Sequence, residues 1–178
     1  MLLGLGGCTV LIVLLLVVVG GCAAIIANIG GGTESKSRTP KGEQAAVSVG
    51  EPVTVGDVVW QVSNARQVNQ LTAQFADPKQ GNFVVVNFSF TNNGNEPATL
   101  DNEPLPLIDS EGRKFKTEAD LIRYVPRDRN VFLERVNRGV TREGQAIFQG
   151  AAGASGFKLQ AGDTNPFTDE NGYVDLGF

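Results

Sequence analysis

The chain has 178 residues, with 15 Lys and Arg, 19 Asp and Glu, no His and two Cys, which gives a formal net charge of −4. The lack of His excludes Ser-His-Asp and Cys-His hydrolases, H-E-x-x-H zinc proteases and two-His-one-carboxylate iron sites. The acidic balance argues against nucleic acid as a partner, because general nucleic-acid binding needs a basic footprint.

The N-terminal segment carries no charge up to and including Thr33, and residues 9–29 are nearly all apolar. As a helix, residues 9–29 would be about 30 Å long, which matches the hydrocarbon core of a bilayer. A helix in a soluble core would show a polar stripe, and this segment shows none. The sequence therefore predicts a transmembrane or signal-anchor segment over residues 1–32, with residues 9–29 in the membrane.

Both cysteines lie in this segment, and Cys22 supports a second interpretation. Val19-Gly20-Gly21-Cys22 resembles a lipoprotein signal box, in which Cys22 is lipidated and the residues before it are removed. Two departures favour the uncleaved anchor: no Lys or Arg precedes the apolar core, and residues 23–27 stay apolar where a lipoprotein usually turns polar. Lipidation at Cys22 and a cleaved signal remain the alternatives. The rest of the chain has no Cys, which excludes a disulfide, a cysteine nucleophile and a thiolate metal site there.

Residues 33–46 are rich in Ser, Thr, Lys and Glu and lack apolar periodicity, which is typical of a flexible linker. The basic residues nearest the span, Lys36, Arg38 and Lys41, follow it, so the positive-inside rule would place the C-terminal domain in the cytoplasm. The signal-like N-terminus and the fold expected below favour the opposite topology. We expect a single-pass membrane protein whose C-terminal domain is extracytoplasmic.

From residue 47 onward the sequence has the pattern of β-strands. In the clearest case, residues 83–90, four apolar side chains share one face, while Asn87 and Ser89 share the other. Further strands are expected at 53–55, 58–62 continuing toward Val68, 105–108, 114–116, 145–149, 156–159 and 173–176, with one helical turn allowed at 118–124. About seven short strands without a 3.6-residue period predict an all-β, immunoglobulin-like antiparallel β-sandwich over residues 47–178. Trp60 is expected in its core.

The order of these segments resembles a known family, and the resemblance rests on residues 56–62, 81–93, 107–115 and 145–148. It is a bacterial domain-of-unknown-function family of lipoproteins and membrane-anchored proteins, with the immunoglobulin-like fold of the mycobacterial immunoprotective secreted antigen. The resemblance covers about residues 47–178. It implies an extracytoplasmic domain on a membrane anchor and brings no catalytic residues with it. Asn137-Arg138-Gly139 departs from the Pro-Gly turn of many members, but Gly139 keeps the permissive backbone position.

A run of arginines stands out in this acidic chain: Arg123, Arg127, Arg129, Arg135, Arg138 and Arg142. Guanidinium groups suit phosphate and carboxylate, so the run is a candidate contact for an anionic polymer or a lipid headgroup. The alternative is a solvated loop whose charges pair with neighbouring acids.

Two other patterns do not amount to a site. The acidic C-terminal cluster offers oxygens suited to Ca²⁺ but lacks the register of an EF-hand loop, and a polar turn explains it better; its members are Asp163, Asp169, Glu170, Asn171 and Asp175. Ser155-Gly156-Phe157-Lys158 matches S-x-x-K without the S-D-N and K-T-G partners of penicillin-recognising enzymes. No catalytic, cofactor-binding or metal site is predicted.

These observations predict a non-enzymatic binding or cell-envelope interaction module of unknown ligand. Its contact surface would be the arginine run or an exposed sheet edge, and its partner an unknown protein or an envelope polymer. The alternative is a structural or accessory subunit of a membrane complex, whose span packs through the small residues Gly20 and Ala24.

Overall fold

The computed structural model describes residues 45–100, 105–165 and 167–178. Within these residues no helix has the length and apolarity that a membrane crossing needs. The predicted span at residues 9–29, Cys22 and residues 33–44 of the predicted linker lie outside the described residues.

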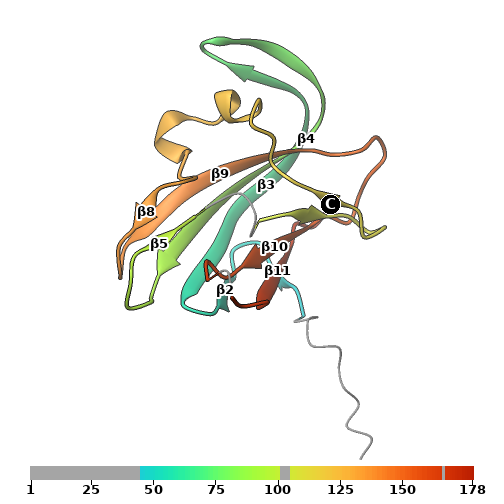
Figure 1. Ribbon diagram of the computed structural model, residues 1–178. Coiled ribbons are helices and arrows are strands. Elements are labelled where there is room, and N and C mark those ends of the chain that lie inside the picture. Colours follow the sequence, from blue (N-terminus) through green and yellow to red (C-terminus); the bar gives the residue numbers. More distant parts are fainter. Residues whose placement is uncertain (1–44, 101–104, 166) are drawn as a thin grey trace, which may run out of the picture. The chain divides into compact units, whose positions relative to one another are not determined.

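Two β-sheets form the sandwich that the sequence predicts (Figure 1). The first sheet is antiparallel, in the order β2-β3-β4-β9, with β2 at Pro52–Val55, β3 at Val58–Ala73, β4 at Ala76–Asn92 and β9 at Thr141–Gln149. The second sheet has the order β1-β11-β10-β6-β7, with β1 at Val47–Ser48, β11 at Asn171–Asp175, β10 at Lys158–Gly162, β6 at Leu107–Ile108 and β7 at Lys114–Phe115. The pairing of β1 with β11 is parallel, so the prediction of a purely antiparallel sandwich is wrong at this edge.

Four short elements lie outside these two sheets. The strands β5 (Ala98–Thr99) and β8 (Arg135–Val136) pair with each other as a separate ribbon. Two 3₁₀ turns follow β7, η1 at Ile122–Tyr124 and η2 at Arg127–Arg129. The turn after β8 contains Gly139 with a φ of 72°, so the permissive position expected there is used.

The core lies between the sheets and follows the period-two pattern of β4. The side chains of Val84, Val86, Phe88 and Phe90 are all buried in it. Trp60 is 1% exposed, packs edge-on against Phe90 with ring centroids 4.9 Å apart, and donates a hydrogen bond from Nε1 to the Gly162 carbonyl at 3.0 Å. Because Trp60 belongs to the first sheet and Gly162 to the second, this side chain ties the layers together. The predicted core position of Trp60 is confirmed.

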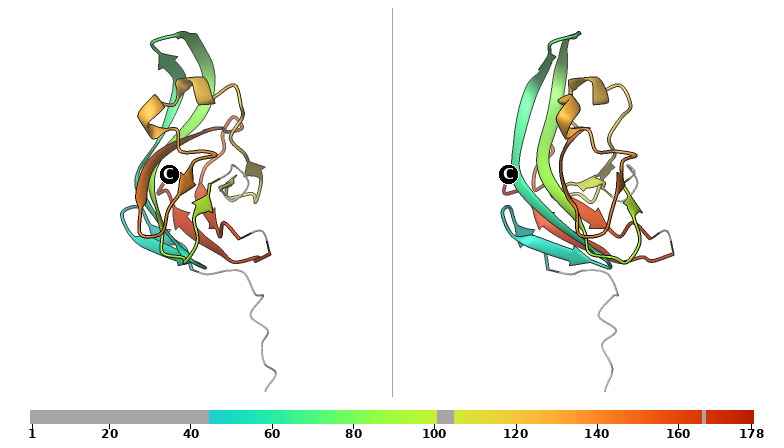
Figure 2. Two further views of the ribbon diagram at one scale, coloured as in Figure 1. Left: turned by 60° about the vertical axis from the view of Figure 1, so that its left-hand side comes forward. Right: turned by 90° about the vertical axis from the view of Figure 1, so that its left-hand side faces the viewer.

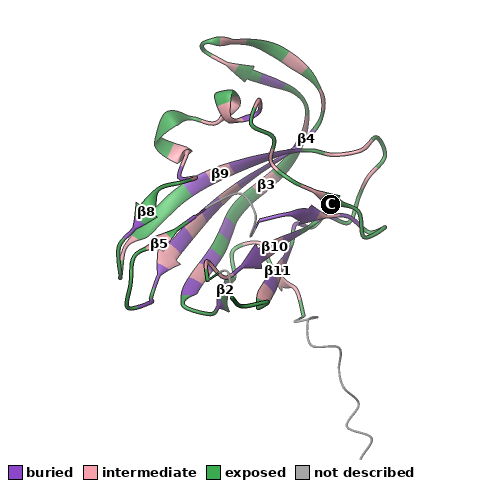
Figure 3. Ribbon diagram, in the orientation of Figure 1, coloured by how far each residue is buried: buried purple, intermediate pink, exposed green. Residues whose placement is uncertain are grey.

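The largest difference from the prediction is the length of the β3–β4 hairpin. Its far part extends past the second sheet in all three ribbon views, and we call residues 63–82 the arm (Figures 1 and 2). Most of the arm is exposed, in contrast to the buried stretches of β4 and β9 (Figure 3). The β3–β4 register shifts three times, between Val62 and Asn64, Val68 and Gln70, and Leu71 and Ala73. Such bulges bend a strand and increase its twist, which agrees with the curved arm.

One face of the arm is covered by the segment between β7 and β8. Leu121 is buried there in a second, smaller apolar cluster with Leu71, Phe83, Val85 and Ile147. The Tyr124 hydroxyl donates to the Asp77 carbonyl at 2.7 Å, and Lys79 pairs with Asp120. These contacts hold the arm from one side only.

Candidate functional site

An open pocket of about 520 Å³ lies at the base of the arm. It is lined by Gln67, Val68, Asn69, Asn82, Phe83, Val84, Gly150, Ala151, Gly153, Ala154 and Phe157. Two neighbouring strands supply the first six residues, because Gln67 pairs with Val84 and Val68 with Phe83 in the β3–β4 ladder. The loop after β9 supplies the others, and the Gly150 N–H anchors it to the Asn82 carbonyl at 2.9 Å.

The pocket has an apolar base and a polar rim. Val84 and Phe157 are each only 2% exposed and belong to the main core, so they form the base. The side chains of Gln67, Asn69 and Asn82 are exposed and form the rim. None of the lining residues carries a charge.

This lining can recognise hydrogen-bonding groups in a ligand. A side-chain amide both donates and accepts, and the three rim amides present both kinds of group toward the pocket. Gly153, at a φ of 74°, has no side chain to cover the backbone of the loop. A neutral ligand with paired donors and acceptors fits this environment, whereas a charged ligand would lose hydration without gaining an ion partner.

Next to the pocket, the outer edge of β3 is open. β2 pairs only with Val58–Gln61, and the Gly50 N–H then donates to the Val62 carbonyl at 2.8 Å. From residue 63 to residue 73, no strand of the described ranges pairs with this edge. Arg66 is the one charged residue in these eleven positions.

The six arginines of the predicted anionic contact do not form a single cluster of free charges. Arg129 pairs with Glu143 at 2.9 Å, and Arg142 pairs with Glu134 at 3.4 Å. The other four are exposed, and none of them makes an ion pair in the described part of the chain, although the charge of Arg123 contributes to lowering the pKa of Asp120: Arg123, Arg127, Arg135 and Arg138. The ion pairs of Arg129 and Arg142 fit the solvated, partly paired interpretation, and the anionic contact of the run stays a prediction.

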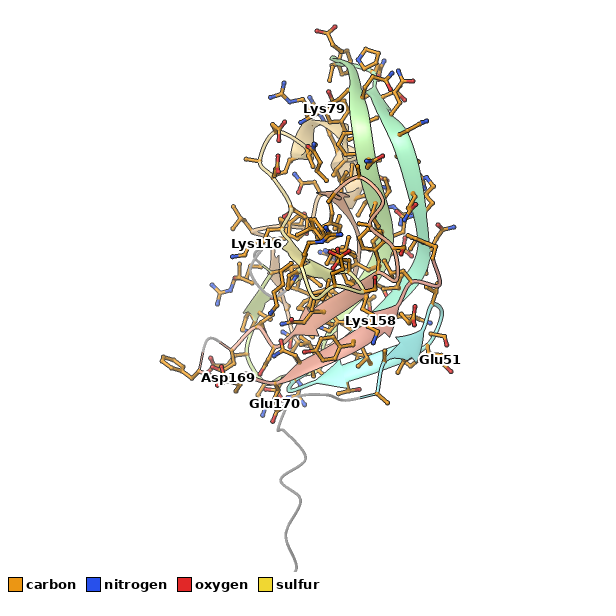
Figure 4. All side chains as sticks on the ribbon, turned by 90° about the vertical axis from the view of Figure 1, so that its right-hand side faces the viewer. Glu51, Lys79, Lys116, Lys158, Asp169 and Glu170 are labelled. Carbon is orange, nitrogen blue, oxygen red and sulfur yellow. The ribbon has the colours of Figure 1, made fainter. Side chains whose placement is uncertain are left out.

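Asp163, Asp169, Glu170 and Asn171 of the acidic C-terminal cluster lie in or beside the β10–β11 turn, whereas Asp175 lies at the other end of β11, opposite Lys158. Thr168 donates from Oγ1 to the Asp163 carboxylate at 2.8 Å, and the Asn171 amide donates to the Asp169 carbonyl at 3.0 Å. In the described part of the chain, no three His, Cys, Asp or Glu side chains are grouped to hold a metal ion. Figure 4 places Asp169 and Glu170 at the end of the domain opposite Lys79, which lies on the arm.

The Ser155–Lys158 pattern opens no helix in the structure. Ser155 lies in an exposed loop, and Lys158 is the first residue of β10. The structure therefore gives the pattern none of the context that acylation chemistry needs.

The buried carboxylate of Asp109 belongs to a turn rather than to the pocket. It accepts hydrogen bonds from the backbone N–H groups of Glu111 and Arg113, at 3.0 and 2.9 Å, and from Nε of Arg113 at 2.6 Å. Burial acts to raise the pKa of Asp109, but these hydrogen bonds and the Arg113 charge outweigh it and hold the pKa below its usual value. The same pairing raises the pKa of Arg113.

The pocket residues were not singled out by the sequence, although a signal was present. Residues 61–82 contain eight Asn and Gln and few charges, which is unusual for a solvated hairpin. The fold and the pocket define the class of protein: an all-β sandwich module with an arm and a neutral, amide-lined pocket.

The chain belongs to the DUF4352 family, a domain of unknown function, whose family model matches residues 47–172. This confirms the family resemblance described above. A comparison with curated proteins gives no significant match.

Solved structures with a similar fold come from several bacteria. The yjhA protein of Bacillus subtilis is 13% identical, with a TM-score of 0.56 over 73% of this chain and 98% of that one. The secreted protein MPT63 of Mycobacterium tuberculosis is 10% identical, with a TM-score of 0.51 over 75% of this chain and 99% of that one. The ycdA protein of B. subtilis, named as a candidate lipoprotein, is 13% identical, with a TM-score of 0.50 over 71% of this chain and 39% of that one. At these identities the likeness concerns the fold alone.

Proposed function

We propose that this protein is an extracytoplasmic, non-enzymatic binding module that takes an uncharged, amide-bearing ligand in the pocket at the base of the arm. An apolar anchor at residues 9–29, or a lipid on Cys22, would hold it at the membrane. A β-sandwich fold shared with a secreted protein and a candidate lipoprotein supports the extracytoplasmic location. The non-enzymatic assignment rests on a chain without His, in which Cys occurs only at positions 8 and 22.

The pocket is the observation that carries this proposal. Its volume of about 520 Å³ lies in the range of small-molecule sites, and an apolar base with a few polar groups is their usual composition. The rim amides of Gln67, Asn69 and Asn82 match the donor and acceptor of another amide group. Peptide bonds and N-acetylated sugars both supply that group, and they are the two sources of ligand to separate by experiment.

The test uses the full-length protein in detergent micelles, with backbone amide NMR signals as the readout. Two neutral probes are titrated separately to millimolar concentration: di-N-acetylchitobiose and acetyl-trialanine amide. We expect one of them to shift the signals of residues 67–69, 82–84 and 150–154, and the active probe identifies the source. In Asn69→Asp, which places a charge at the rim at nearly unchanged volume, the affinity should fall about tenfold or more.

The matched control is Asn95→Asp, which puts the same charge on an exposed amide outside the pocket. It should bind the active probe like the parent protein. If neither probe shifts the pocket signals, or if the shifts persist unchanged in Asn69→Asp, the pocket is not the binding site and the proposal is wrong.

A further inference from the structure

The sheet edges of this domain are protected unequally. At the far side of the first sheet, β9 carries Arg142 and Glu143, and both are engaged in ion pairs. β2 is short and begins with a proline, and the edge strands of the second sheet, β1 and β7, have two residues each. Charge, proline and short length are the devices by which edges avoid pairing with other chains.

The edge of β3 has neither a proline nor a short length, and its three register shifts bend it without removing its unpaired backbone groups. Its unpaired length of eleven residues, 63–73, exceeds every other sheet edge among the described residues, and Arg66 is its single charge. An edge of this length presents a row of unpaired backbone donors and acceptors, which is a template for another strand.

We propose that this edge pairs with the same edge of a second copy of the chain, giving a two-fold dimer with one continuous sheet. The two ends of the open edge fix the register, because β2 blocks residues 58–61 and the hairpin turn follows Ala73. An antiparallel pair that uses all eleven residues of both copies places Val68 at the two-fold axis. A two-fold contact needs a self-complementary surface, and a nearly neutral edge supplies one.

This register avoids every like-charge contact along the pair. Each Arg66 lies opposite Gln70 of the second copy, and each Gln67 lies opposite Asn69 of the second copy, so that amides meet amides near the axis. A register centred on Arg66 would bring two like charges together and is disfavoured. Because Gln67 and Asn69 also line the pocket, the two pockets of the dimer would lie on the same face of the joined sheet, near its axis.

The same register provides a neighbour for the exposed aromatic residue at the arm tip. Phe75 is 85% exposed. With Val68 on the axis, the arm tip with Phe75 ends next to Pro52 of the second copy, the first residue of β2 and the partner of Gln61. An apolar ring that is largely exposed in one copy thus comes to lie against the end of β2 in the other.

The experiment measures self-association of the full-length protein in detergent micelles by sedimentation velocity. The parent chain is expected to form a dimer. The double variant Gln67→Lys with Asn69→Lys places a lysine opposite a lysine at both pairs next to the axis. It should raise the dissociation constant of the dimer about tenfold or more. Gln67→Lys with Asn69→Glu places each new lysine opposite a new glutamate, and should restore association to within about threefold of the parent. Both positions are exposed, so neither variant disturbs the core.

A control pair, Thr141→Lys with Gln149→Lys, adds the same charge to exposed positions of β9 and should leave the dimer unchanged. A parent chain that stays monomeric up to about 100 μM overturns the proposal. A dimer that is insensitive to the Lys-Lys pair, or not restored by the Lys-Glu pair, also overturns it, because the contact then lies elsewhere, for example in residues 9–29. The proposal is independent of the ligand in the pocket, since self-association is measured without a probe.

Discussion

Asp109 shows how a single residue closes a turn of the second sheet. The turn joins β6 to β7, and the carboxylate gathers two backbone N–H groups and the Arg113 guanidinium around itself. The carboxylate is buried while Arg113 is partly exposed, so the ion pair forms at the surface of the core. The sequence predicted strands at residues 105–108 and 114–116, but not that the Asp109 carboxylate between them would be buried.

This arrangement predicts a pH-dependent stability. The pKa of Asp109 is held below its usual value near 3.8, so its stabilising contribution is complete above that value and is lost as the pH falls through the lower, folded value. Asp109→Asn should therefore lower the midpoint of thermal unfolding at pH 7, and the difference from the parent should shrink as the pH falls from about 5 to about 2. Asp77→Asn, at an exposed carboxylate, is the control and should change the midpoint little at any pH. A difference that is constant over this range would contradict the assigned role of the charge.

At the scale of elements, the arm depends on the segment that covers one of its faces. Leu121 is 1% exposed and packs on Leu71, Phe83, Val85 and Ile147, which come from β3, β4 and β9. An extended hairpin with few apolar contacts is marginal by itself. The arm is therefore ordered by this contact and by the bond from Tyr124 to Asp77.

Leu121→Ala tests this dependence. Removing the buried side chain should cost about 3 kcal/mol in the free energy of unfolding, because it leaves a cavity between the segment and the arm. Backbone amide exchange should accelerate most in residues 68–72 and 79–85, which lie beneath the segment. The control is Ile122→Ala, where the half-buried neighbour lies outside this cluster and should cost about 1 kcal/mol. Uniform acceleration over the whole domain in Leu121→Ala would show that the arm is not a separate cooperative unit.

The elements also show what a sequence can predict. Residues 83–90 alternate between apolar and polar, and the apolar face is the one that is buried, because period two determines which side chains face a core. Beyond Val68 the arm was missed because most of its side chains are polar, on both faces, and the pairing of β3 with β4 keeps it extended where few side chains are buried. In such a segment, the amino-acid composition of a strand resembles that of a loop.

At the scale of the whole molecule, the pocket is formed by the pairing register of β3 with β4 and not by a sequence motif. The pocket joins residues 67–69, 82–84 and 150–157, and only the β3–β4 register and the bond from Gly150 to Asn82 bring them together. No spacing of residues along the sequence predicts that these three segments lie together. The sequence analysis named an exposed sheet edge as a candidate contact surface but did not locate it. Its position on β3 follows from the structure, in which β2 pairs only with residues 58–61.

The described chain begins at the end of the domain opposite the arm tip (Figure 1). The proposed function requires this domain to lie outside the cytoplasm. The account therefore depends most on the arm being outside the cytoplasm. The direct measurement is labelling of Gln74→Cys, at the exposed tip of the arm, with a small membrane-impermeant maleimide in intact cells of the host. The parent chain, which contains Cys8 and Cys22, gives the background. We predict that intact and lysed cells show equal labelling above this background; labelling that appears only after lysis would place the domain in the cytoplasm and contradict the proposed function.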